Sequence, residues 1–128
     1  MHNLTISPIR AFSDNYIWLI VKGNQGFVVD PGEAPPVMEA LQDLGVQLTG
    51  ILVTHHHFDH IDGNLTLKEK YKCKIIGFID DKKRIPGIDI CLKNEEIFKE
   101  GDFQFKTYHT PGHTSGHICY HFFNDKIL

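Results

Sequence analysis

Residues 54–60 read Thr-His-His-His-Phe-Asp-His and directly follow the apolar run 50–53. An apolar run that leads into a cluster of metal-ligand residue types indicates a strand that ends in a metal-binding loop. In an extended segment residues i and i+2 point the same way, so His55 and His57 can bind one ion. Where the chain turns, Asp59 and His60 point in a different direction from this pair and can bind a second ion. The stretch therefore predicts a site with room for two ions close together.

The ligand types narrow the choice of metal without deciding it. Imidazole nitrogen combined with carboxylate oxygen suits zinc, and also iron or manganese. Residues 54–60 could instead be a solvated loop, a surface stretch that binds metal without function, or an expression tag. The stretch is internal and lies between a strand pattern and a helix pattern, which argues against a tag. We therefore interpret it as a metal site.

A second histidine cluster spans residues 109–121, where a histidine recurs at every fourth position. That spacing imitates a helical face, but Pro111, Gly112 and Gly116 lie inside it and disfavour a continuous helix. We expect a tight loop that enters a strand at about residue 117. The Pro-Gly turn can bring His113 close to the first cluster, which makes His113 the best candidate for a third imidazole beside His55 and His57.

The remaining histidines have other expected roles. His56 lies between two ligands and should point away from the ion. His109 precedes the turn and is expected to be structural or to support a ligand. His117 could hold the metal loop through a ring hydrogen bond, and His121 is expected to be a packing residue whose ring is hydrogen-bonded. Eight of the nine histidines fall in these two segments, so chance clustering is a poor explanation.

Hydrophobic patterning predicts an α/β fold, because strands alternate with helices. A strand at 4–12 contains Pro8, which implies a sheet edge or a bulge. Pro35 and Pro36 suit the first turn of a helix that Gly45 ends, and a second helix is expected after residues 62–64. The other expected strands lie at 15–21, 27–30, 50–54, 73–77, 88–92, 96–99, 103–108 and from about 117.

Composition favours one globular domain over residues 1–128, since 41% of the residues are hydrophobic and 23% are charged. A formal charge of -3 without long blocks of one sign offers no electrostatic case for nucleic acid or a membrane surface. No apolar run reaches the length of a membrane span, and the first residues do not resemble a signal peptide, so a cytoplasmic location is the default expectation. Cys73, Cys91 and Cys119 are expected to be buried free thiols, and the alternative is a thiolate that binds metal.

Four motifs together resemble a known family. Thr-His-x-His-x-Asp-His followed by Pro-Gly-His-Thr is similar to the metallo-β-lactamase superfamily. More narrowly, the stretches resemble the glyoxalase II (hydroxyacylglutathione hydrolase) family; they are residues 12–18, 29–34, 54–60 and 110–117. The resemblance covers essentially the whole chain, which corresponds to the N-terminal part of that family. The family's metal-bridging Asp, its last His ligand and its glutathione-binding groups are expected beyond residue 128.

The resemblance implies an αββα sandwich, truncated here, and a two-metal hydrolase that uses zinc. It assigns His55, His57 and His113 to the first metal and Asp59 and His60 to the second. The implied substrate is a small glutathione thioester, S-D-lactoylglutathione, cleaved to D-lactate and glutathione. In the implied reaction a hydroxide attacks the thioester carbonyl and a thiolate leaves, while Asp59 binds metal and orients the hydroxide.

Other functions stay open beside this one. The same fold supports a persulfide dioxygenase, a lactamase or a nuclease, and a fragment without the remaining ligands would bind metal without turnover. A truncated sandwich is also expected to supply little of its second sheet, and therefore to be marginally stable or to self-associate through an uncovered inner face. The residues of that face are Tyr16, Trp18, Phe27, Val29, Ile118, Tyr120 and Phe122.

Overall fold

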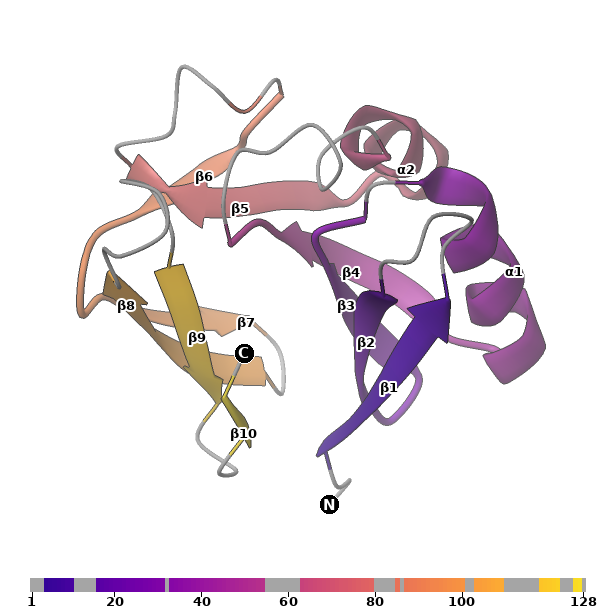
Figure 1. The fold of residues 1–128 in the computed structure, drawn as a ribbon, viewed down its shortest axis with the longest axis horizontal. Helices are drawn as coiled ribbons and strands as arrows, with labels where there is room; N and C mark the ends of the chain where they lie inside the picture. Colours follow the sequence, from indigo (N-terminus) through magenta and orange to yellow (C-terminus); the bar gives the residue numbers. More distant parts are fainter. Residues whose placement is uncertain are drawn as a thin grey trace.

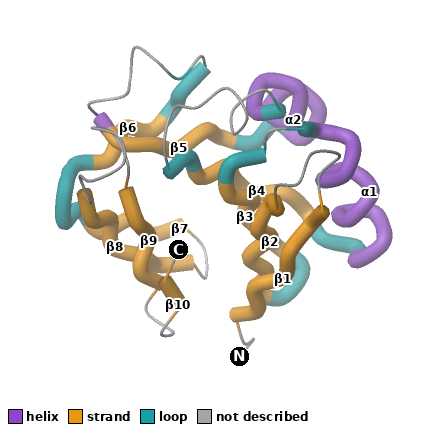
Figure 2. Tube along the Cα trace, in the orientation of Figure 1, coloured by secondary structure: helices purple, strands orange, loops and turns teal. Residues whose placement is uncertain are grey.

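Two β-sheets face each other, and two helices lie on the outer side of the larger sheet (Figure 1). The structure is a computed structural model. It describes residues 4–10, 16–31, 33–54, 63–79, 85, 87–100, 103–109, 118–122 and 126–127. The predicted α/β class is confirmed, because helices and strands form separate layers (Figure 2).

The larger sheet has six strands in the order β1-β2-β3-β4-β5-β6. Its strands are β1 (Leu4–Arg10), β2 (Tyr16–Lys22), β3 (Gln25–Val29), β4 (Gln47–Leu52), β5 (Lys74–Phe78) and β6 (Ile90–Leu92). The pairs β1–β2 and β2–β3 are antiparallel, whereas β3, β4, β5 and β6 are parallel to one another. Strand β1 lies at the edge of the sheet, as Pro8 predicts.

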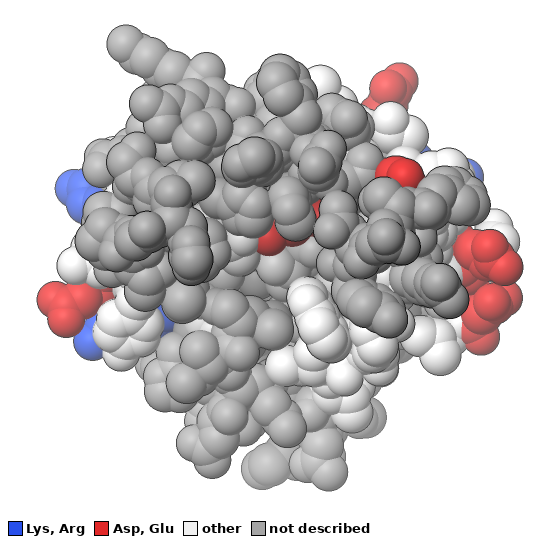
Figure 3. Space-filling view, viewed as in Figure 1, with Lys and Arg blue, Asp and Glu red and all other residues white. Residues whose placement is uncertain are grey.

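Helix α1 (Ala34–Leu44) joins β3 to β4, and helix α2 (Asn64–Tyr71) precedes β5. Helix α1 starts at its proline pair and ends at Gly45, whose φ of 65° is the left-handed conformation that glycine adopts most easily. Glu39 and Asp43 of α1 are exposed. Figure 3 shows acidic side chains on the side of the molecule where α1 lies. Among the described residues, no helix is both long and apolar enough to cross a bilayer.

The smaller sheet has four antiparallel strands in the order β10-β9-β8-β7. They are β7 (Ile97–Glu100), β8 (Phe103–His109), β9 (Ile118–Phe122) and β10 (Lys126–Ile127). The start of β9 at residue 118 confirms the strand expected from about residue 117. Within β8, Phe103, Phe105 and Thr107 are buried, because alternate residues of a strand point to the same face of the sheet.

Two hydrophobic clusters hold these layers together. One lies between the helices and the larger sheet and includes Val37, Leu41 and Leu67. The other fills the space between the two sheets, where the rings of Phe27 and Phe103 meet edge to face with centroids 4.6 Å apart. Cys73 is buried in the first cluster, as expected for a structural thiol.

The expected loss of cover over the inner face is wrong for three of the residues named for it. Phe27, Val29 and Tyr120 are 0%, 3% and 0% exposed. The reason is that strands β7 to β10 already form a second sheet, which packs over the central strands of the larger one. Trp18 nevertheless stays 39% exposed. The side chains of Tyr16, Ile118 and Phe122 lie outside the described part of the structure.

Candidate metal site

The structure describes the residues that flank the two histidine clusters. All five predicted metal ligands lie outside the described residues; these are His55, His57, Asp59, His60 and His113. The same holds for His56 and His117, and for the side chains of His109 and His121, so the roles assigned to them stay predictions. The flanking residues show how the start and end of each cluster are held.

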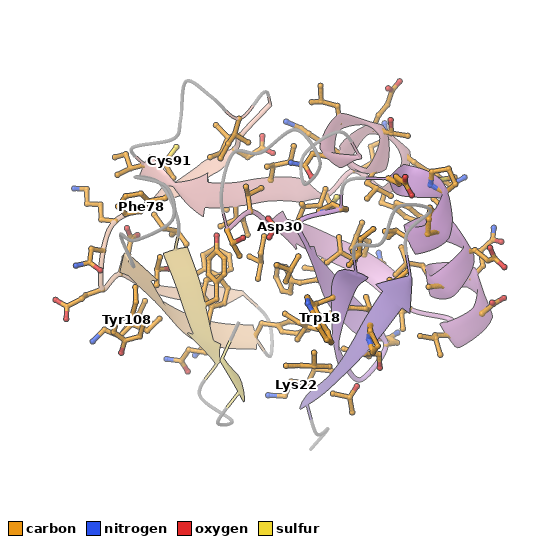
Figure 4. The ribbon with its side chains drawn as sticks, viewed as in Figure 1. Trp18, Lys22, Asp30, Phe78, Cys91 and Tyr108 are labelled. Carbon is orange, nitrogen blue, oxygen red and sulfur yellow. The ribbon has the colours of Figure 1, made fainter. Side chains whose placement is uncertain are left out.

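Asp30 and Thr54 join the ends of two parallel strands. Strand β3 ends at Val29, and Asp30 leaves it with a φ of 50°, a left-handed conformation that Asp tolerates better than most residues. The Asp30 backbone N–H donates to the Leu52 carbonyl at 2.9 Å. Thr54 then donates its backbone N–H to Asp30 Oδ1 at 2.8 Å and its hydroxyl to Asp30 Oδ2. Figure 4 shows Asp30 in the middle of the molecule, near the ends of β3 and β4.

The carboxyl group of Asp30 has an unusual proton affinity. Burial raises its pKa to about 7, and the hydrogen bonds from the Thr54 hydroxyl and backbone N–H oppose that rise. A buried carboxylate is costly unless it is hydrogen-bonded or paired. Thr54 supplies the hydrogen bonds, so Asp30 can hold the residue that directly precedes His55.

Gly63 closes the other end of segment 55–62. Its backbone N–H donates to the Pro31 carbonyl oxygen at 2.9 Å. A Cβ at this position would lie 2.4 Å from the same oxygen and 3.0 Å from the carbonyl carbon of Glu33. Only glycine permits this approach. Both ends of the first histidine cluster are therefore anchored to the consecutive residues Asp30 and Pro31.

The second cluster begins on β8 and ends on β9, which pair with each other, and a hydrogen bond connects β9 to the chain just before the first cluster. Residues His109 and Ile118 face each other in the β8–β9 ladder, so segment 110–117 connects two hydrogen-bonded strands. Two residues into β9, the Tyr120 hydroxyl donates to the Val53 carbonyl oxygen at 2.6 Å. Val53 lies two residues before His55. The chain positions that flank the two clusters are thus in direct contact across the two sheets.

The whole chain beyond its first strand matches a known family. Residues 11–128 match the model described as the metallo-beta-lactamase superfamily. The chain belongs to the metallo-beta-lactamase superfamily. The resemblance noted in the four motifs is confirmed at this level.

Two curated relatives in this superfamily carry the name hydroxyacylglutathione hydrolase. The one from Pelagibacter ubique is 49% identical over 127 residues, which cover 98% of this chain and 53% of the relative. The one from Rhizobium etli is 44% identical over 130 residues, which cover 100% of this chain and 51% of the relative. The chain spans about half the length of the curated relatives it matches.

Solved structures of the superfamily share the fold. The B3 metallo-beta-lactamase BLEG-1 superimposes with a TM-score of 0.82 at 22% identity. The aligned region covers 92% of this chain and 67% of BLEG-1. ETHE1 from Myxococcus xanthus superimposes with a TM-score of 0.76 at 23% identity over 99% of this chain and 55% of its own. The predicted metallo-β-lactamase type of fold is therefore confirmed.

Sequence reasoning did not find the residues that anchor the clusters in this superfamily fold. It interpreted Asp30 as the end of a strand, Pro31 as the start of the turn that follows it and both as part of the motif at 29–34, and it placed Tyr120 on an apolar inner face. Two signals were available. A carboxylate at the end of a buried strand needs a hydrogen-bond donor, and a buried tyrosine needs a partner for its hydroxyl. Neither signal names the partner, because Tyr120 and Val53 are 67 residues apart.

The predicted donor set fits a divalent metal of the kind the superfamily name implies. Three imidazoles with a carboxylate and a fourth imidazole match the ligand preferences of zinc, iron and manganese. Anchoring of both clusters fits the same conclusion, since metal sites need their ligand-bearing segments held from outside the ligands. Within the described ranges, no group of three His, Cys, Asp or Glu side chains forms a further candidate site.

Proposed function

We propose that this chain carries the metal-binding part of a thioesterase that hydrolyses S-(2-hydroxyacyl)glutathione, such as S-D-lactoylglutathione, to glutathione and a 2-hydroxy acid. The observation that carries the proposal is the 49% identity, over 98% of the chain, to a relative named hydroxyacylglutathione hydrolase. The sequence features used to reach the same class are the four motifs at 12–18, 29–34, 54–60 and 110–117.

We assign the metal to the predicted ligands, with His55, His57 and His113 at a first ion and Asp59 and His60 at a second. Zinc is the metal we propose, and iron or manganese would suit the same donors. When bound, such an ion lowers the pKa of a coordinated water and polarises a carbonyl group. Asp59 would accept a hydrogen bond from the attacking water and so orient it toward the thioester carbonyl. The thiolate of glutathione leaves without a strong general acid.

The described residues contribute by holding these groups in place. Asp30 fixes Thr54 directly before His55, and Pro31 fixes Gly63 at the end of the same segment. Catalytic groups must be held within a fraction of an ångström, since a small displacement costs much of the rate. The two anchors therefore favour a metal-dependent reaction over a loose surface metal scavenger.

The length of the relatives favours a second proposal for the 128 residues taken alone. The match covers 53% of the Pelagibacter ubique relative, so the other part of that protein has no counterpart in this alignment. We therefore assign full thioesterase activity to a protein of the relatives' length, with a small-molecule glutathione thioester as its partner. For these residues alone we propose tight binding of the first ion, weaker binding of the second and poor turnover.

A substrate panel tests the proposal. Hydrolysis of S-D-lactoylglutathione is measured for the 128-residue chain and for a protein of the relatives' length that contains it, with zinc added and with zinc removed by a chelator. A simple thioester without glutathione and a β-lactam serve as competing substrates. We expect zinc-dependent hydrolysis with a clear preference for the glutathione thioester in the longer protein. Equal rates on all three substrates would contradict the proposed function.

A further inference from the structure

A single peptide group is held by buried side chains from both sheets. The carbonyl oxygen of Val53 accepts a hydrogen bond from the Tyr120 hydroxyl at 2.6 Å. The N–H of the same peptide group, which belongs to Thr54, donates to Asp30 Oδ1 at 2.8 Å. Tyr120 lies on β9 of the four-stranded sheet, whereas Asp30 follows β3 of the six-stranded sheet. All four residues are buried, so both bonds are shielded from water.

Tyr120 is itself rigidly placed. Its side chain is 0% exposed, and its ring meets the ring of Phe105 edge to face, with centroids 5.2 Å apart at 89°. In the β8–β9 ladder it lies opposite Thr107, which is also fully buried. A ring fixed in this way cannot follow a displacement of its partner, so the Val53 carbonyl must keep its position to keep the bond.

The peptide group held between Tyr120 and Asp30 occupies a particular place in the chain. Thr54 directly precedes His55, the first residue of the first histidine cluster. Tyr120 follows His117 in the strand into which the second cluster leads. The bond between Tyr120 and Val53 is therefore a short route by which the position of one cluster is transmitted to the other.

We propose that Tyr120 is a positioning residue for metal binding: its hydroxyl fixes the Val53–Thr54 peptide, and with it the start of the first histidine cluster, relative to strand β9, which carries the end of the second cluster. The inference rests on the metal site proposed above. Its basis is the contact between described residues, and it assigns to Tyr120 a role that packing alone would not require. Loss of a hydrogen bond made directly to a metal ligand typically weakens metal affinity by about 10-fold to 100-fold, and Tyr120 acts on a peptide group next to the ligand segment, so we expect the low end of that range.

The test compares Tyr120→Phe with Tyr108→Phe in the 128-residue chain. Both changes remove one hydroxyl and keep the ring. Tyr108 is the matched control because it lies in the adjacent strand β8 and is half-buried, while its neighbour Thr107 faces the interior. Figure 4 shows Tyr108 on the outer side of the smaller sheet. Co²⁺ serves as the probe, since its visible absorption reports the geometry of the ligands as well as occupancy.

Two quantities are measured for each variant. The first is the dissociation constant for Co²⁺, by competition with a chelator, together with the visible spectrum of the complex. The second is the free energy of unfolding of the metal-free chain, so that binding is compared only where each variant is folded. We expect Tyr120→Phe to weaken Co²⁺ binding by about 10-fold and to change the spectrum. Tyr108→Phe should leave both unchanged.

The outcomes separate this inference from the function on which it rests. A Tyr120→Phe variant that is less stable but binds Co²⁺ with unchanged affinity and spectrum would overturn the positioning role alone. A wild-type chain that binds no Co²⁺ would overturn the proposed metal site and this inference with it. If Tyr120→Phe does not fold, Phe105→Leu takes its place, because it keeps the hydroxyl and removes the ring that orients it. Weaker Co²⁺ binding in that variant supports the inference, and unchanged binding overturns it.

Discussion

Asp30 accepts two hydrogen bonds from Thr54, one from the backbone N–H at 2.8 Å and one from the hydroxyl. The two residues are 24 positions apart, and both are buried. The pair closes the gap between the end of β3 and the end of β4, directly before the first predicted metal ligand. It is therefore the point where the fold of the larger sheet and the proposed metal site meet.

We predict that Asp30 makes the metal-free chain less stable as the pH rises toward neutral. Burial raises the pKa of Asp30 from 3.8 to about 7. Between these values the folded chain keeps a proton that the unfolded chain releases, so the contribution of Asp30 to stability is largest below pH 4 and is lost as the pH rises to about 7. The slope is about 1.4 kcal/mol per pH unit, or about 3 kcal/mol between pH 5 and pH 8.

The comparison with Asp30→Asn isolates this effect. Nine histidines also titrate between pH 5 and pH 8, so the slope of the wild type alone does not identify Asp30. Denaturant unfolding is measured at pH 5 and pH 8 for both proteins without metal. Asp30 should lower the unfolding free energy of the wild type by about 3 kcal/mol between pH 5 and pH 8, and this loss should be absent from the pH profile of Asp30→Asn. Parallel pH profiles would show that Asp30 does not titrate in this range.

Substitution of Gly63 should disturb the end of the first histidine cluster. In Gly63→Ala the new Cβ would lie 2.4 Å from the Pro31 carbonyl oxygen, which is backbone and cannot rotate away. We expect a loss of about 1–3 kcal/mol of unfolding free energy, measured by urea denaturation, together with weaker zinc binding.

Gly45→Asn is the control for Gly63→Ala. A Cβ at Gly45 meets no atom within 4 Å, and asparagine tolerates the left-handed φ of 65° at the end of α1. It should cost less than about 1 kcal/mol and leave zinc binding unchanged. Equal losses in the two variants would mean that contact with Pro31 is not what requires glycine at residue 63.

Removal of predicted ligands should separate the two ions. Loss of a group that supports a metal ligand lowers metal affinity by about 10-fold to 100-fold. We expect a larger loss of affinity for the first ion when a ligand itself is removed, in His55→Ala, His57→Ala and His113→Ala. Asp59→Asn should mainly affect the second ion. Metal content after dialysis against a weak chelator measures both effects. His56→Ala is the control, since His56 is expected to point away from the ion, and a loss of metal in that variant would contradict the assignment.

Self-association of the 128-residue chain should depend on Trp18. Trp18 is 39% exposed and pairs with Pro8 and Val29, so it lies on the face that packs against the smaller sheet. We expect the apparent mass in sedimentation to rise with concentration for the wild type and to rise less for Trp18→Gln. Ile97→Gln is the control, because Ile97 is 54% exposed and lies on the outer face of the smaller sheet, opposite Lys106. An equal effect of both changes would argue against a specific contact at Trp18.

Local chemistry was sufficient to predict most of the helices and strands. The proline pair and Gly45 mark the ends of α1 because both residues act on the backbone where they stand. Pro8 predicts a sheet edge or a bulge, and β1 lies at the edge; the strand expected from about residue 117 begins at residue 118. The proposal that His and Asp side chains bind the metal also rests on residue type, and it stays a prediction because those residues lie outside the described part of the structure.

Only the tertiary structure showed which residues hold the segments that flank the predicted ligands. The bond from Tyr120 to Val53 and the bonds from Thr54 to Asp30 join segments that no local pattern relates. Phe27 was predicted to be uncovered, but it is buried and its ring meets that of Phe103 from the other sheet. This contact also joins segments that no local pattern relates. Hydrogen-bond partners and cover across a sandwich depend on how two sheets are stacked, and the period of a strand specifies only which face a residue takes. The sequence therefore determined the residue types of the proposed site, and the packing of the two sheets determined which residues hold the segments on either side of it.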